Sequence, residues 1–84
     1  MLNAPYPNPF NPIVNFDIVL SNAQNININI YDVRGEKIDN IFSGLLNQGT
    51  HAFNWKAINQ STGVYIIKCE TTNLSSTKKV FLIK

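Results

Sequence analysis

The side chains that could carry chemistry are few, and they form no catalytic or metal-binding pattern. His51 is the only histidine and Cys69 the only cysteine, so a Cys/His metal set cannot be assembled. No nucleophile with an orienting acid adjoins His51, which is better explained as a surface or strand-edge residue. The acidic residues are dispersed, with no calcium-loop spacing: Asp17, Asp32, Glu36, Asp39 and Glu70. We therefore expect no catalytic residue, no metal site and no cofactor.

The final stretch of the chain offers a different chemistry, recognition by a partner. An apolar run is preceded by two lysines and followed by one: Lys78, Lys79, Val80, Phe81, Leu82, Ile83 and Lys84. We call these residues the terminal stretch. An apolar run of this kind favours a central strand buried on both faces. The alternative is an edge strand that a partner takes by backbone pairing, with the lysines facing an acidic receptor surface.

Aromatic rings offer a further recognition chemistry, because sugars stack on them. Tyr6, Tyr31, Trp55 and Tyr65 are the candidates. Trp55 shares a strand face with Phe53 and is expected in the core. Tyr31 lies on the opposite face from the neighbouring isoleucines and is the one ring expected to be exposed. A single exposed ring is ordinary on a protein surface, so sugar binding stays an alternative.

The composition is that of one small folded domain. The 84 residues are 44% hydrophobic and only 14% charged, with a net charge of +2. The basic residues are scattered, which argues against a nucleic-acid partner. Sparse charge is compatible with weak self-association. No segment is long enough to span a bilayer, and no signal peptide is visible. If the domain is part of a secreted protein, its export signal is expected on a longer parent chain.

Alternation of apolar and polar residues predicts the strands that position these groups. Expected strands cover residues 13–20, 25–31, 37–42, 50–55, 64–70 and 77–84. Asp32 and Gly35 fit the first and last positions of a hairpin turn. Several short strands with turns between them predict an all-β sandwich or barrel of about seven antiparallel strands. Cys69 is expected inside it as a small hydrophobe.

The first twelve residues carry all four prolines and exclude a helix. We expect residues 1–12 to form an extended lead-in and the junction with an upstream domain. Tyr6 and Phe10 would be its apolar anchors. Residues 13–84 would then form the sandwich itself.

Five short motifs, in this order, resemble the type A C-terminal sorting domain of the type IX (Por) secretion system. The resemblance covers nearly the whole chain. The motifs are Tyr6-Pro7-Asn8-Pro9-Phe10-Asn11-Pro12, Ile30-Tyr31-Asp32 with Gly35, Gly49-Thr50-His51 with Trp55, Gly63-Val64-Tyr65, and Lys78-Lys79 with the apolar end.

The resemblance implies an immunoglobulin-like sandwich at the end of a protein secreted by Bacteroidetes-type bacteria. The parent would cross the periplasm and reach the cell surface or the medium. The expected partners are the outer-membrane translocon and its shuttle barrel. A sortase-like peptidase often removes such domains and may join the cargo to anionic lipopolysaccharide.

The resemblance also implies which residues matter. It assigns the sorting signal to Gly63, Tyr65 and the terminal stretch. The motif from Tyr6 to Phe10 marks the junction, with cleavage expected around residues 1–6 or just upstream. A rival similarity is to immunoglobulin-like domains of the flagellar hook-capping type, in which the module would be a spacer or surface anchor.

Overall fold

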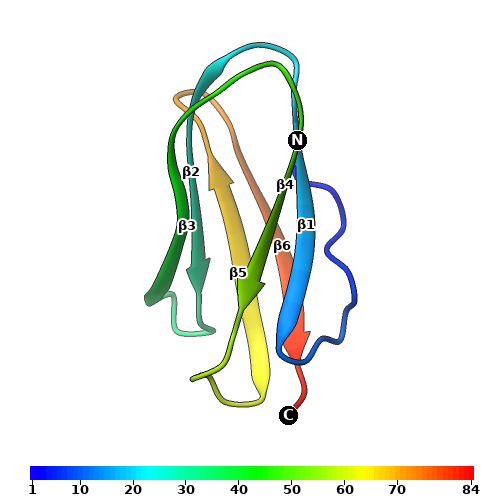
Figure 1. The fold of residues 1–84 in the computed structure, drawn as a ribbon. Coiled ribbons are helices and arrows are strands. Elements are labelled where there is room, and N and C mark those ends of the chain that lie inside the picture. The colour runs from blue at the N-terminus through cyan, green and yellow to red at the C-terminus, as the bar shows by residue number, and fades with distance from the viewer.

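Two antiparallel sheets face each other across one core in the computed structural model, which describes all residues from 1 to 84 (Figure 1). The smaller sheet has the order β1-β4 and the larger one β3-β2-β5-β6. The strands are β1 (Ile13–Leu20), β2 (Gln24–Tyr31), β3 (Lys37–Leu46), β4 (Gly49–Lys56), β5 (Gly63–Glu70) and β6 (Ser75–Leu82). The structure contains no helix that is long and apolar enough to cross a membrane.

The all-β prediction is confirmed, but the strands number six rather than about seven. The segment before β1 forms only isolated bridges, which join Leu2 to Ile18, Tyr6 to Asn15 and Phe10 to Leu82. Its four prolines explain this, because each lacks the N–H that a continuous ladder requires.

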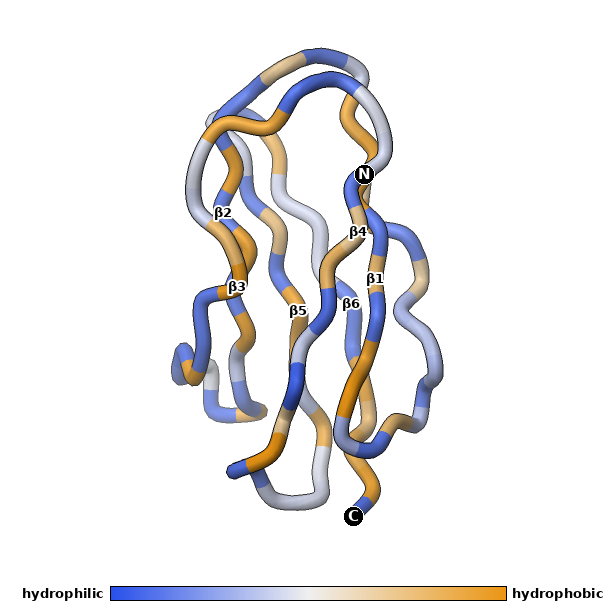
Figure 2. The backbone as a smooth tube through the Cα atoms, viewed as in Figure 1, coloured by the Kyte–Doolittle hydropathy of each residue, from blue (hydrophilic) through white to orange (hydrophobic).

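The core is built from the inward faces that the alternation predicted, and Figure 2 shows that alternation along β2. β1 contributes four side chains, β2 three isoleucines and β5 three more residues. All ten are buried: Val14, Phe16, Ile18, Leu20, Ile26, Ile28, Ile30, Tyr65, Ile67 and Cys69. Trp55 from β4 is buried as expected and packs on the Phe10 ring, with centroids 5.7 Å apart.

β3 is longer than the sequence indicated. Residues 43–46 were expected in a loop, but they continue the strand because β2 offers backbone partners as far as Gln24, opposite Leu46. The pairing of β2 with β3 is irregular, with register shifts after Ile28 and after Ile30. These shifts let both Ile41 and Phe42 pack against the core.

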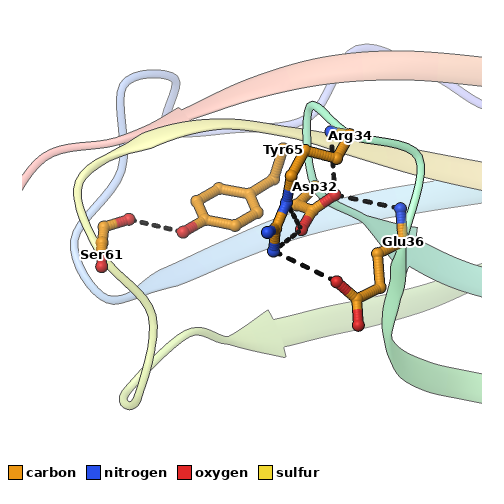
Figure 3. Close-up of polar contacts among 5 residues, drawn as sticks. All are labelled: Asp32, Arg34, Glu36, Ser61 and Tyr65. Atoms are coloured by element: carbon orange, nitrogen blue, oxygen red, sulfur yellow. Dashed lines mark hydrogen bonds and ion pairs between the residues drawn. The ribbon is translucent and has the colours of Figure 1, made fainter.

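The turn between β2 and β3 is organised by one carboxylate (Figure 3). Asp32 Oδ1 accepts the backbone N–H groups of Arg34 at 2.9 Å and of Glu36 at 3.0 Å. Arg34 Nη2 lies 3.0 Å from Asp32 Oδ2 and 3.1 Å from a Glu36 oxygen. Gly35 has φ +84°, which a side chain would disfavour. The hairpin turn predicted from Asp32 and Gly35 is confirmed.

Asp32→Ala should destabilise the domain at neutral pH, and the loss should shrink in acid. The backbone N–H of Glu36 and the Arg34 guanidinium hold the pKa of Asp32 below its ordinary value of 3.8. The carboxylate therefore stabilises the fold above that value, and its contribution disappears as the pH falls through the lowered pKa. Urea midpoints of the variant and the parent, measured across pH, test this.

Asp17→Ala is the matched control, because the Asp17 carboxylate makes no hydrogen bond. A midpoint difference for Asp32→Ala that stays constant into strong acid would contradict the assignment.

Candidate functional site

The residues that the resemblance singles out lie together on the β5–β6 hairpin. Gly63 lies opposite Leu82, and Tyr65 lies opposite Val80. The junction motif joins them from the other end of the chain, because its residues pair with β6. The structure thus brings both sets of expected site residues to one side of the sandwich.

Asn8 and Phe10 bind the outer edge of β6 through four hydrogen bonds, which we call the clasp. Asn8 Nδ2 donates to the Lys79 carbonyl (3.2 Å), and the Phe81 N–H donates to Asn8 Oδ1 (2.9 Å). The Phe10 N–H donates to the Phe81 carbonyl (2.9 Å), and the Ile83 N–H donates to the Phe10 carbonyl (3.0 Å). A side-chain amide here takes the place of a backbone peptide, and no local pattern around Asn8 indicates this role.

The first six residues pair in the same way with the edge of β1. Tyr6 and Asn15 exchange two backbone hydrogen bonds of 2.8 Å. The Asn3 N–H donates to the Asp17 carbonyl, and the Val19 N–H donates to the Met1 carbonyl. The N-terminal segment therefore runs along β1 and then along β6, so that it closes one side of the sandwich (Figure 1).

β6 is an edge strand, so the interpretation of the terminal stretch as a central strand buried on both faces is wrong. Val80 and Leu82 point into the core, whereas Phe81 is 41% exposed and Ile83 44%. The run is apolar throughout because the buried Val80 and Leu82 alternate with the exposed Phe81 and Ile83. The clasp also limits edge pairing, since it covers the backbone from the Lys79 carbonyl to the Ile83 N–H.

The lysines of the terminal stretch differ in their surroundings. Lys78 and Lys79 are exposed and form no ion pair. Lys84 is engaged, because its Nζ donates to the Ile58 carbonyl (2.9 Å) and its backbone N–H donates to Thr62 Oγ1 (3.1 Å). Lys78 and Lys79 are thus free for a partner, while Lys84 ties the chain end to the β4–β5 connection.

Tyr65 supports the fold from within. It is 6% exposed, and its ring meets the Trp55 ring edge-on at 5.2 Å. Its hydroxyl donates to the Ser61 carbonyl, four residues upstream, and so fixes the turn that leads into β5 (Figure 3). Gly63, at the start of that strand, leaves open space where a Cβ would lie.

The remaining candidate residues form no reactive centre. The His51 ring contacts the Asn47 carbonyl through Nε2 at 2.7 Å, and no three His, Cys, Asp or Glu side chains could share a metal ion. Burial raises the pKa of the Cys69 thiol to about 11, so the thiol stays protonated and unreactive at neutral pH.

The aromatic rings form no common platform for a sugar. Trp55 and Tyr65 are buried, and the Trp55 indole donates to Asp39 Oδ2 at 3.2 Å. Tyr31, expected to be the exposed ring, is only half-buried and lies beneath Lys68 Nζ, which is 5.9 Å from its centroid. Tyr6 is the most exposed ring, at 54%, and pairs with the other sheet.

Comparison with known proteins decides the family. A family model described as a secretion system C-terminal sorting domain matches residues 4–84. The chain belongs to this family. No curated protein and no solved structure gave a match.

Members of this family are non-catalytic sorting signals for secretion by the type IX system. The sorting domain therefore belongs to a secreted protein destined for the cell surface or the medium, and it acts together with the type IX machinery. The site of interest is accordingly a recognition surface.

Asn8→Ala should loosen the clasp locally and leave the rest of the sorting domain folded. The Phe81 N–H loses its acceptor, whereas the Ile83 N–H keeps the Phe10 carbonyl. Hydrogen exchange should therefore accelerate at Phe81 and change little at Ile83, with a stability loss of about 0.5–1.5 kcal/mol. Equal exchange at Phe81 in the variant and the parent would contradict the clasp.

Tyr65→Phe should reduce stability by about 1 kcal/mol, because it removes the bond to the Ser61 carbonyl and keeps the ring in its packed position. Urea denaturation measures this loss. Tyr31→Phe is the control, since the Tyr31 hydroxyl makes no hydrogen bond within the domain, and its urea midpoint should not move.

Proposed function

We propose that the folded sandwich is itself the export signal, read by the outer-membrane translocon and its shuttle barrel. The observation that supports this most strongly is the two-sided character of the terminal stretch. Val80 and Leu82 hold the sandwich together, while Lys79 and Phe81 alternate with them and face outward. Lys78 lies opposite the buried Ile67, on the inward side of β6, but its side chain is exposed. A receptor that contacts this outward face reads a surface that exists only when the inward face is packed.

We also propose that the domain is an immunoglobulin-like sandwich, and two features support this fold. Tyr65 makes the bond to upstream backbone that is known as a tyrosine corner in that fold. The N-terminal segment pairs with β1 and then with β6 and so takes the place of a first strand. Counted this way, the domain has seven extended segments.

Cleavage by a sortase-like peptidase would fall upstream of the paired N-terminal segment. Leu2 is 5% exposed, and the backbones of Asn3 and Tyr6 are hydrogen-bonded to β1. A peptidase needs an extended and accessible chain, and this backbone is already paired. We propose that residues 1–12 serve both as the junction with the cargo and as part of the sandwich, and that the parent passes through the periplasm before cleavage.

An export assay tests the proposed function. A signal peptide, a fluorescent reporter and these 84 residues are fused and expressed in a host with an active type IX system. Surface and medium fluorescence should be present in that host and absent from a translocon-deficient strain. Reporter trapped in the periplasm of both strains would contradict the proposal.

The Lys78→Ala/Lys79→Ala double variant should reduce export of this fusion while leaving the fold intact. Exposed lysines contribute little to stability, usually within about 0.5 kcal/mol, so recognition is separated from folding. Lys56→Ala on β4 is the matched control and should be exported like the parent. Export of the double variant at the parental level would show that these two lysines are not part of the signal.

A further inference from the structure

The outer face of the larger sheet is covered by no other element of the chain (Figure 1). In an antiparallel sheet, directly opposed residues share one face. Tyr31 on β2 lies opposite Ile66 on β5, which lies opposite Lys79 on β6. Val64 and Phe81 form the next such pair. Tyr31, Val64, Ile66 and Phe81 thus make a continuous apolar cluster, which we call the outer patch.

The outer patch is accessible and slightly hollowed. Val64 is 38% exposed and Phe81 41%, while Tyr31 and Ile66 are half-buried. A hollow of about 260 Å³ lies between Tyr31, Ile66, Lys68 and Gly35. A concave apolar site of this size has room for a side chain of a partner.

Three lysines surround the outer patch. Lys37 lies opposite Tyr31, Lys68 lies over the Tyr31 ring, and Lys79 lies opposite Ile66. Lys37 and Lys79 form no ion pair within the domain. Lys68 lies 3.7 Å from Glu70, an exposed pair that contributes little and can be exchanged for another carboxylate.

The nearby carboxylates are too few to neutralise the three lysines, because only Glu70 is paired with one of them. Asp32 and Glu36 are both held by Arg34 in the turn. The other half of the same face is mainly polar and carries one charged residue, Glu70, opposite Asn27. There the Asn40 amide donates to Asn29 Oδ1 at 2.7 Å. The three lysines and the apolar cluster therefore lie together on one half of the sheet, whereas the exposed Leu45 lies apart from them on the other half.

We propose that the outer patch is the docking surface for an acidic segment of a type IX machinery protein. That segment would place an apolar or aromatic side chain in the hollow and carboxylates beside Lys37, Lys68 and Lys79. The charge of the face selects such a partner, since opposite charges across an interface steer association and fix its register. The inference rests on the proposed sorting function and extends the recognition surface from β6 across the sheet to β3.

The decisive variant lies outside the terminal stretch. Tyr31→Asn/Lys37→Glu removes the ring of the hollow and reverses one charge, while Lys78 to Lys84 stay unchanged. Export of the reporter fusion should fall by at least about tenfold, as expected when a like charge replaces a complementary one in a contact. Lys37→Glu alone changes only an exposed side chain and tests the charge if the double variant is unstable.

Val19→Asn/Lys56→Glu is the matched control on the smaller sheet. Val19 is 43% exposed and Lys56 is exposed, so the same kinds of change fall on the opposite face. This control should be exported normally. Lys37→Arg keeps the positive charge and should also be exported.

The outcomes separate this inference from the function on which it rests. If export of the parental fusion depends on the translocon but Lys37→Glu is exported equally well, the outer patch is not the docking surface. The sorting function would then still hold. If export of the parental fusion does not depend on the translocon, both the outer patch and the sorting function are contradicted.

Two other occupants are tested on the purified domain. A concentration-dependent dimer in sedimentation that Tyr31→Asn abolishes would assign the outer patch to a second copy of the chain. Flotation with vesicles of phosphatidylglycerol and phosphatidylcholine that Lys37→Glu abolishes would assign it to a lipid surface. Either result would overturn the proposal, whereas a monomer that does not bind these vesicles supports it.

Discussion

The pairing of the N-terminal segment with both sheets is the interaction on which the rest of the structure depends. Residues 1–6 cover the edge of β1, and the clasp of Asn8 and Phe10 covers the end of β6. An uncovered strand edge is a template for unwanted pairing. Because the segment covers the strand edges, the terminal stretch is left open to a partner mainly on the outer face of the larger sheet.

This arrangement places residues that fold the domain and the residues of the proposed recognition surface in the same strand. β6 contributes two fully buried side chains, Val80 and Leu82, to the core and one exposed apolar side chain, Phe81, to the surface. The surface that a receptor could read is therefore displayed only by the packed domain. A receptor that reads this surface, as we propose, would therefore recognise only the folded domain.

The sequence was sufficient for features set by local periodicity and turn chemistry. Alternation in β1, β2 and β5 correctly assigned every inward residue, since a half-buried strand repeats every second position. Asp32 and Gly35 marked the first hairpin because their own backbone preferences require it. The family followed from motif order, which the match over residues 4–84 bears out.

Features that depend on distant pairing could not be predicted in this way. The position of β6 at an edge is set by its neighbours in the sheet, and its apolar run looks the same in a central strand. The extension of β3 to Leu46 depends on β2 partners, and the clasp joins residues more than 70 positions apart. The outer patch likewise exists only in the register of three strands.

The most direct test of this account is the stability of residues 13–84 without the N-terminal segment. Removal of residues 1–12 takes Leu2 and Phe10 out of the core, at about 1.5–3 kcal/mol each, and uncovers two strand edges. A small domain has a free energy of unfolding of about 5–15 kcal/mol, so most of its stability would be lost. Urea denaturation of both forms should show a cooperative transition for residues 1–84 and a greatly lowered or absent one for residues 13–84. The same midpoint for both would show that the N-terminal segment is only a linker and would contradict the account.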